Sequence, residues 1–166
     1  MLYEKYSRLL LGICMRYAGD RAEAEDILQD SFLKIFSRIK DFTGTGSFTG
    51  WLRKVVVNTA ITNYHANLKF RYHVDIEEYV SSEHASSDID EAMFTADELF
   101  CVLNELPKGY RMVFNLYAIE GYAHKEISGM MKISEGTSKS NLSRARMILQ
   151  RRVGSFTGIK RRVANE

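Results

Sequence analysis

The chain has 166 residues, of which 45% are hydrophobic and one is proline. This length accommodates one ordinary domain or two small ones, and the apolar content excludes a largely disordered chain. The net charge of +2 conceals two basic blocks around an acidic segment: residues 1–72 carry +4, residues 73–105 carry −10 and residues 106–166 carry +8. Basic blocks suggest a polyanionic partner, although solvated helix faces have a similar composition.

The residue inventory argues against an exported protein and against an enzyme. Cys14 and Cys101 lie among apolar residues without C-x-x-C spacing, which predicts two buried structural thiols in a reducing compartment. The charges in the first helix argue against a signal peptide, and no apolar run is long enough to cross a bilayer, so we expect a cytoplasmic protein without membrane insertion. The histidines lack metal-ligand spacing, and no phosphate loop or nucleophile triad occurs. We therefore expect no metal, no cofactor and no catalytic residues.

Scarce strand-like alternation predicts an all-α fold, beginning with three helices over about residues 2–17, 21–40 and 48–70. Asp20 and Ser47 are expected to cap the second and third helices. Apolar residues at helical spacing predict the buried stripes. These are Leu2, Tyr6, Leu9, Leu10, Ile13 and Tyr17 in the first helix; Ile27 or Leu28, Phe32, Ile35, Phe36 and Ile39 in the second; and Leu52, Val55, Val56, Thr59 and Ala60 in the third.

Residues 73–93 are rich in acids and serines, and we interpret them as a flexible linker. A capping box at Thr95 predicts a helix through about Leu106, and Pro107 opens another that Gly121 closes. A short helix over 124–131, a turn over 132–134, a helix over 135–153 and a frayed basic tail over 154–166 follow. The prediction is two small helical domains, residues 1–72 and 94–153, joined by the acidic linker.

Residues 124–150 have the form of a helix-turn-helix. Ser134 can cap the last helix, and apolar residues are spaced to pack the helices together: Ile127, Met130, Met131, Ile133, Leu142, Ala145 and Leu149. The early residues of the last helix are small or polar and are expected to face outward; these are Thr137, Ser138, Lys139, Ser140 and Asn141. The candidate contacts also include two arginines that follow, Arg144 and Arg146. Such a helix can lie in a major groove with its basic residues near phosphates. A helical hairpin with a solvated basic face is the alternative.

Residues 133–146 resemble the I-S-E-G-T-V-K-S-R-L-x-R-A-R segment of sigma factors. Leu106-Pro107 with Tyr110-Arg111, and Glu120-Gly121-Tyr122 with Lys125-Glu126-Ile127, resemble the C-terminal domain of the same family. The resemblance implies contact of residues 137–146 with the minus-35 promoter element. Ser138 replaces the usual valine, Lys132 the usual turn glycine, and Ala123 a common capping serine or threonine. The last change is expected to weaken the start of the short helix by ~1 kcal/mol.

Residues 20–32 resemble the sigma segment D-x-A-E-D-x-x-Q-x-x-F. The resemblance implies docking on the coiled-coil clamp helices of the large polymerase subunit through Asp26, Gln29, Asp30 and Phe32. An acidic outer stripe suits a basic helical partner. An ordinary solvated helix face would show the same charges.

Residues 42–60 resemble F-R-G-x-x-S-F-x-x-W-L-x-x-I-x-x-N-x-A, the sigma segment that opens and reads the minus-10 element. Aromatic faces and basic side chains can hold unstacked bases, which offsets the cost of unstacking. The candidate minus-10 contacts are Thr43, Ser47, Phe48, Trp51, Arg53, Lys54, Asn58, Asn63 and Tyr64. Phe48 and Trp51 at helical spacing are also typical of a core, so we expect at least one to be mostly buried. Thr43 replaces a common basic residue, which predicts a lower affinity of this loop.

Together the two motif sets resemble a sigma-70 family sigma factor of the extracytoplasmic-function (ECF) type. The implied function is to bind core RNA polymerase, to recognise both promoter elements and to promote DNA melting. Members of the family are commonly regulated by an anti-sigma protein that covers these surfaces, and the resemblance implies such a protein as a possible partner here. One alternative is a transcription regulator that binds duplex DNA unaided, but it would not need the acidic docking face or the aromatic cluster. A helical adaptor that binds only protein would have no use for Lys139, Arg144 and Arg146 on one helix.

Overall fold

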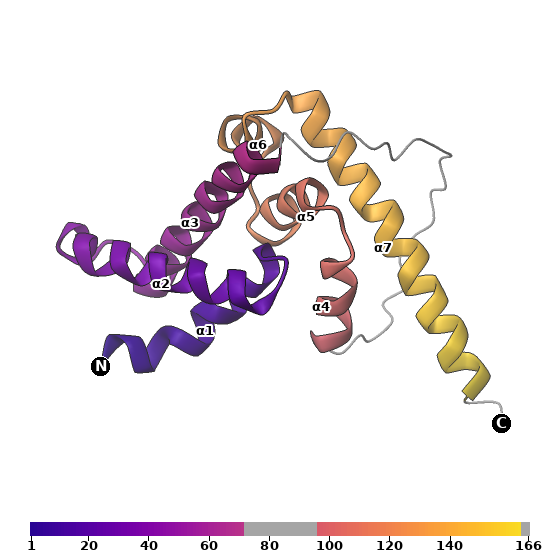
Figure 1. Cartoon of the computed structure of the whole chain (residues 1–166), viewed down its shortest axis with the longest axis horizontal. Helices are drawn as coiled ribbons and strands as arrows, with labels where there is room; N and C mark the ends of the chain where they lie inside the picture. The colour runs from indigo at the N-terminus through magenta and orange to yellow at the C-terminus, as the bar shows by residue number, and fades with distance from the viewer. Residues whose placement is uncertain (72–95, 164–166) are drawn as a thin grey trace. The chain divides into compact units, whose positions relative to one another are not determined.

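The described part of the chain folds into helices (Figure 1). The computed structural model describes the backbone of residues 1–71 and 96–163, and side chains within residues 1–68 and 100–152. The chain divides into two compact units, Met1–Asp75 and Ile76–Glu166. The predicted linker, residues 73–93, and the predicted cap Thr95 lie outside the described residues. Each unit is considered by itself below.

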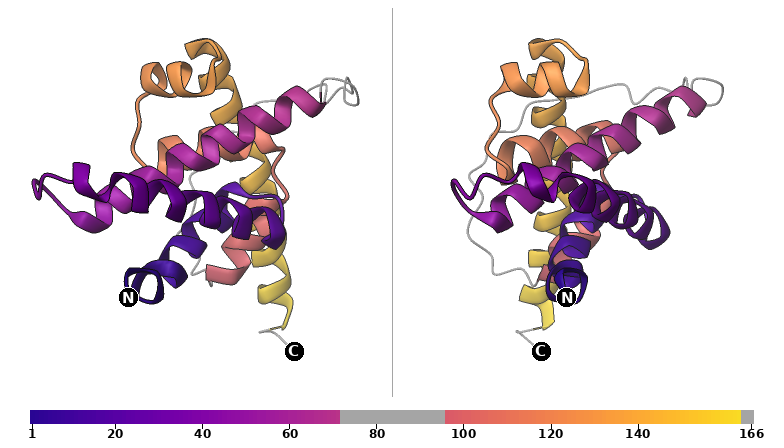
Figure 2. Two further views of the ribbon diagram at one scale, coloured as in Figure 1. Left: turned by 60° about the vertical axis from the view of Figure 1, so that its left-hand side comes forward. Right: turned by 90° about the vertical axis from the view of Figure 1, so that its left-hand side faces the viewer.

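The first unit is a three-helix assembly. It contains α1 (Leu2–Tyr17), α2 (Arg21–Arg38), a 3₁₀ turn η1 (Ile39–Asp41) and α3 (Phe48–Arg71), and each of the three α-helices packs against the other two (Figure 2). The predicted helix bounds are confirmed to within one or two residues. The core of this unit is formed by apolar side chains from all three helices, among them Leu10, Ile13, Ile27, Ile35, Leu52, Val56 and Val57.

Side-chain caps begin α2 and α3 as predicted. The Asp20 carboxylate accepts a hydrogen bond from the backbone N–H of Glu23 at 2.8 Å, and the Glu23 carboxylate accepts one from the N–H of Gly19 at 2.6 Å. At α3 the Ser47 hydroxyl accepts from the N–H of Gly50 at 3.2 Å. These bonds satisfy donors that a helix start otherwise leaves unpaired.

The predicted buried stripes were too wide. Leu9, Phe36 and Ile39 are 50%, 53% and 39% exposed, whereas Leu10 and Ile35 are fully buried. Adjacent residues of a helix point roughly 100° apart, so Leu9 and Phe36 face away from the side that carries Leu10 and Ile35. Ile39 lies beyond the end of α2, in η1. Three of the side chains predicted to be buried therefore lie on the surface of this unit.

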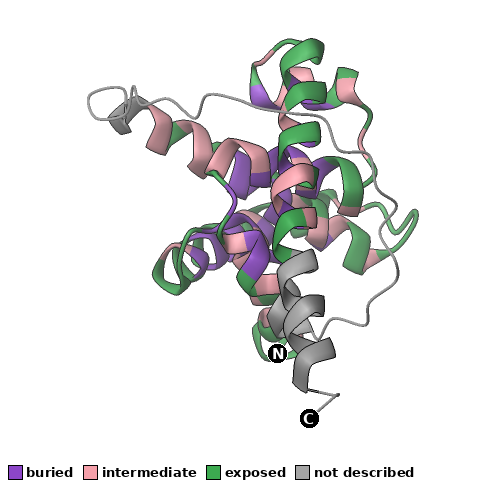
Figure 3. Cartoon of the chain, turned by 90° about the vertical axis from the view of Figure 1, so that its right-hand side faces the viewer, coloured by how far each residue is buried: buried purple, intermediate pink, exposed green. Residues whose placement is uncertain are grey.

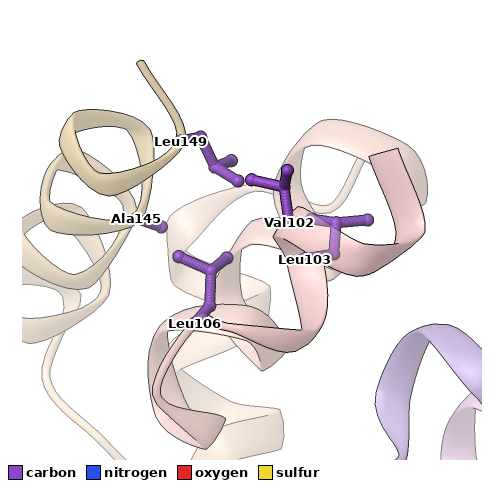
Figure 4. Packing of buried hydrophobic residues seen from close by; sticks show 5 residues of the cluster. All are labelled: Val102, Leu103, Leu106, Ala145 and Leu149. Atoms are coloured by element: carbon purple, nitrogen blue, oxygen red, sulfur yellow. The ribbon is translucent and has the colours of Figure 1, made fainter. Parts of the chain in front are cut away.

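The second unit begins with α4 (Ala96–Asn104), α5 (Lys108–Phe114) and a π-helical turn η2 (Asn115–Ile119), and continues with α6 (His124–Met131) and α7 (Glu135–Val163). Gly121 adopts a φ of 79° after η2, which supports its predicted role in ending the helix. One side of α7 packs on α4 and the turn that follows it (Figure 4), through Ala145 and Leu149 against Val102, Leu103 and Leu106.

Two features of this unit depart from expectation. The predicted single helix from Pro107 is interrupted by η2, where the N–H of Glu120 bonds the carbonyl of Asn115, five residues back. The last helix runs to Val163 instead of ending near Val153. The glycines of residues 154–163 suggested a frayed tail, but a single glycine lowers the stability of a helix interior by only about 1 kcal/mol.

A buried arginine joins α4 to α5. Arg111 is 5% exposed, and its guanidinium donates to the Asn104 side chain and backbone carbonyl at 3.2 and 3.0 Å and to the Leu106 carbonyl at 3.2 Å. The backbone carbonyl of Asn104 ends α4 and that of Leu106 lies in the turn after it, so neither has a partner within the helix. The Arg111 of the sigma-like motif is thus a structural residue.

Candidate nucleic-acid and polymerase interfaces

The predicted helix-turn-helix is confirmed in the second unit. Ile127 and Met131 of α6 and Leu142 and Ala145 of α7 are buried, and α6 packs on α7. The Ser134 hydroxyl accepts a hydrogen bond from the N–H of Thr137 at 3.0 Å, so Ser134 caps α7 as predicted.

Lys132 carries the sharp turn between these helices. Its φ is 55° and its ψ 45°, the left-handed conformation that favours glycine. Lys132 thus adopts the conformation of the glycine that it replaces in the sigma-like motif. The N–H groups of Lys132 and Ile133 both bond the Ser128 carbonyl, so α6 ends in a regular hydrogen-bonded turn despite the side chain.

The outer side of α7 carries most of the predicted minus-35 residues. Thr137, Lys139, Ser140, Arg144 and Arg146 are exposed and Asn141 is half-buried. We call these six residues the recognition face; the outward side of α7 is mainly green in Figure 3. Hydroxyl, amide and basic groups in this arrangement can approach base edges and phosphates.

The prediction that Ser138 faces outward is wrong. Ser138 is fully buried, and its hydroxyl lies 2.9 Å from Nδ1 of His124 on α6. Ser138 precedes Leu142 by four residues and Ala145 by seven, so all three point to the same side of α7. A hydroxyl in the core needs a partner, which His124 provides. Ser138 is thus a packing residue of the helix-turn-helix and not a candidate DNA contact.

The loop before α3 forms the first part of the candidate minus-10 surface. Gly44 and Gly46 have φ values of 76° and 85°, which only glycine adopts without strain. The hydroxyls of Thr43 and Thr45 lie 2.7 Å apart across this turn. Ser47 then caps α3. Thr43 and Ser47 are both exposed, and both lie beside the start of this helix.

An aromatic cluster adjoins this loop. Phe48 and Trp51 stack with ring centroids 5.8 Å apart, Phe42 lies 5.2 Å from Phe48 and 5.8 Å from Trp51, and Tyr6 lies 5.8 Å from Phe48. Phe48 and Trp51 are both partly buried. The cluster therefore contributes to packing and still presents ring surface to solvent, as a site for an unstacked base requires.

The remaining minus-10 candidates are spread along α3. Lys54 and Asn58 are exposed, at three and seven residues from Trp51, and therefore continue the same side of the helix. Asn63 accepts a hydrogen bond from Asn67 at 2.8 Å, and Asn67 also donates to Glu23 at 3.2 Å.

Two further candidates lie off this line. Arg53 is half-buried, and Tyr64 packs edge-on against His65 about 20 Å along the helix from Trp51. The structure therefore brings Thr43, Ser47, Phe48 and Trp51 together, and it does not bring Asn63 or Tyr64 to them.

The outward side of α2 is the candidate polymerase surface. Asp26, Gln29 and Asp30 are exposed as predicted. Phe32 is 3% exposed, as its place in the predicted buried stripe implies, and its ring packs against Tyr3 with centroids 4.6 Å apart, so its side chain does not lie on this outward surface. Its neighbour Leu33 is 68% exposed and lies on the side of Asp26, seven residues earlier.

Sequence reasoning therefore missed Leu33 and the exposed Phe36 three residues beyond it. The seven-residue spacing from Asp26 to Leu33 could have identified the former. We define the docking surface as Asp26, Gln29, Asp30, Leu33 and Phe36. It combines carboxylates with exposed apolar groups, a composition typical of a protein-binding patch.

Two family models match the chain: Sigma-70 region 2 over residues 2–68 and Sigma-70, region 4 over residues 96–149. RNA polymerase sigma-H factor of Pseudomonas aeruginosa is 29% identical over 156 residues, which cover 88% of this chain and 81% of that protein. ECF RNA polymerase sigma-E factor of Haemophilus influenzae is 28% identical over 163 residues, which cover 92% and 86%.

A solved structure has a similar fold. The sigma factor RpoE in complex with the anti-sigma factor NepR, from Bartonella quintana, aligns with a TM-score of 0.55 and 22% identity over 92% of this chain and 94% of that one. Within the residues that the structure describes, no helix has the length and apolar character needed to span a bilayer. The same residues bring together no group of three side chains able to bind a metal ion.

Both units thus match successive regions of one family, and relatives align along most of the chain. The chain belongs to the sigma-70 family of RNA polymerase sigma factors, which are transcription initiation factors. Within that family it is an ECF sigma factor, similar in sequence to the sigma-E and sigma-H factors along almost its whole length.

Proposed function

We propose that this sigma factor divides its work between three surfaces: the docking surface binds core polymerase, the loop and aromatic cluster hold the melted minus-10 strand, and the recognition face of α7 reads the minus-35 duplex. The observation that carries the proposal is the different chemistry of these surfaces. One combines acids with exposed apolar groups, one is aromatic, and one is hydroxylic and basic.

For core polymerase, the proposed partner is the pair of clamp helices of the large subunit. Asp26, Asp30 and Leu33 lie on one side of α2, because Asp30 follows Asp26 by four residues and Leu33 follows Asp30 by three. A basic helical partner would pair with the carboxylates at the rim and bury the leucine at the centre. Because Phe32 is already buried against Tyr3, its side chain contributes by holding α1 on α2.

For the minus-10 element, Phe48 and Trp51 offer the ring surface and Lys54 a nearby charge. A base that leaves the duplex loses stacking worth a few kcal/mol, and stacking on an aromatic side chain returns ~1–3 kcal/mol. The loop of residues 43–47 supplies hydroxyls next to this cluster, and Asn58 supplies an amide one turn beyond Lys54. Promoter opening would thus use binding energy, with no bond made or broken by this chain, and we assign it no enzymatic activity.

For the minus-35 element, α7 would enter the major groove with Thr137, Ser140 and Asn141 toward the bases. Lys139, Arg144 and Arg146 would neutralise phosphates or bind guanine edges. The protein would act in the cytoplasm, where core polymerase works. An anti-sigma protein that covers these surfaces fits the same chemistry, since the structural relative RpoE is described in complex with NepR.

The salt dependence of DNA binding tests the minus-35 assignment. The probe is a duplex with the minus-35 element of a promoter that the holoenzyme selects from a random library. Replacing Lys139 and Arg144 with alanine should weaken binding and lower the slope of log affinity against log salt by roughly 2, because each lost phosphate contact lowers it by about 1. The control replaces Arg38 and Lys40, two exposed charges of the first unit. An unchanged slope for the α7 variant would contradict the assignment.

A further inference from the structure

Two arginines of the recognition face occupy opposite edges of α7. Arg144 and Arg146 are two positions apart, so they point roughly 200° apart around the helix. Both are exposed, yet each side chain contacts a tyrosine from the preceding part of the unit, Tyr110 of α5 and Tyr117 of η2. Neither tyrosine was a candidate contact from the sequence.

Tyr110 holds Arg144 by a hydrogen bond. The Tyr110 ring packs against the apolar cluster that joins α4 to α7, and its hydroxyl accepts from a terminal nitrogen of Arg144 at 3.1 Å. The guanidinium has five N–H donors in a rigid plane, so one bond fixes its position and leaves the others available for a phosphate or a base.

Tyr117 holds Arg146 by its ring. The guanidinium carbon of Arg146 lies 5.7 Å from the ring centroid, within the range of a cation–π contact. The same ring stacks on His124 with centroids 4.5 Å apart and planes 19° apart, and Nδ1 of His124 lies 2.9 Å from the buried Ser138 hydroxyl. A connected series of contacts thus runs from the core of the helix-turn-helix to an exposed arginine.

These contacts bear on the entropy of DNA binding. A free arginine samples many rotamers, and binding must select one of them at a cost in side-chain entropy. A guanidinium already held near its binding geometry loses less on binding. This also explains the serine at position 138, since its hydroxyl orients the histidine on which Tyr117 stacks.

We propose that Tyr110 and Tyr117 are positioning residues for minus-35 recognition, each holding one arginine of α7 in its DNA-binding geometry. The inference rests on the proposed DNA contacts of Arg144 and Arg146. It predicts a specific coupling pattern, Tyr110 with Arg144 and Tyr117 with Arg146, and no coupling across the two pairs.

Crossed double-mutant cycles test this pattern on the full chain, with affinity for the selected minus-35 duplex as the readout. Y110F removes only the hydroxyl, and Y117L removes the ring at a position that is 36% exposed; each should weaken binding about two- to fivefold. Y110F should have no further effect in an R144A background and its full effect in R146A. Y117L should behave in the opposite way, and Y117F, which keeps the ring, should bind like the unaltered protein.

The outcomes separate the two levels of the proposal. If R144A and R146A leave affinity unchanged, the DNA contacts themselves are wrong and the positioning role falls with them. If both arginine variants weaken binding but the tyrosine variants do not, only the positioning role is overturned. The same holds if each tyrosine variant weakens binding equally in the R144A and R146A backgrounds. Should Y117L fail to fold, Y117M and the independent Y110F cycle provide the same test.

Discussion

Leu33 provides a quantitative test of the docking surface. Its side chain is free in this chain, since the residue is 68% exposed, and it lies on the same side of α2 as Asp26 and Asp30. Complete burial of a leucine side chain stabilises by ~1.5–3 kcal/mol, and about two thirds of that surface is still available to a partner. Leu33→Ala should therefore weaken binding to core polymerase by ~1–2 kcal/mol, or roughly 5- to 30-fold.

The assay is a titration of core polymerase with fluorescently labelled protein, together with chemical unfolding of each variant. The free energy of unfolding should change little for Leu33→Ala, because the side chain makes few contacts within the unit. Phe32→Ala should have the converse effect and cost ~3–5 kcal/mol of stability, because Phe32 is buried. Leu9→Ala shortens a comparably exposed leucine of α1 and serves as the control. Unchanged polymerase affinity for Leu33→Ala, or an equal loss for Leu9→Ala, would refute the reasoning.

Three further predictions concern local stability and reactivity. Ala123 has the extended backbone of a helix cap, and its N–H donates to the Glu126 carboxylate at 2.8 Å, but its side chain offers no acceptor for the first N–H groups of α6. Ala123→Ser should supply this acceptor and raise the melting temperature of the second unit by ~4–8 °C, whereas the control Ala118→Ser should give no increase. Lys132→Gly should raise the free energy of unfolding by ~0.5–1 kcal/mol, because relief of the left-handed strain exceeds the added entropy of the unfolded chain; a decrease in urea unfolding experiments would contradict the turn geometry. Burial raises the pKa of the Cys14 thiol to about 12, so about 1 in 10,000 is thiolate at pH 8, and the fraction rises with pH. Cys101 is exposed and not buried as predicted, so a maleimide should label Cys101 first and Cys14 only on unfolding; equal rates would show that Cys14 is accessible.

The helices could be predicted from the sequence because their signals are local. Asp20 and Ser47 stand at the starts of apolar-periodic segments, and both cap helices in the structure. The turn at Lys132 was also predicted, since Ser134 marks the start of the next helix. Such signals depend on a few neighbouring residues, and tertiary packing does not override them here.

The errors arose where the fold decides which side of a helix is covered. Phe32 and Phe36 were both placed in the buried stripe of α2, but only Phe32 is buried, where its ring packs against Tyr3 of α1, and Phe36 remains exposed. Ser138 looked like a surface residue because serine usually is one, and its partner His124 lies fourteen residues earlier, beyond any local pattern. The contacts of Tyr110 and Tyr117 with arginines are of the same non-local kind.

Reconstitution with sigma-free core RNA polymerase tests the central claim most directly. The measurement maps the 5′ ends of transcripts made on a library of genomic fragments. Added protein should co-elute with core enzyme and produce defined start sites that share two upstream sequence elements. If the protein never joins the polymerase, starts no transcripts and yet binds duplex operators by itself, then the division of labour between α2, α3 and α7 is wrong.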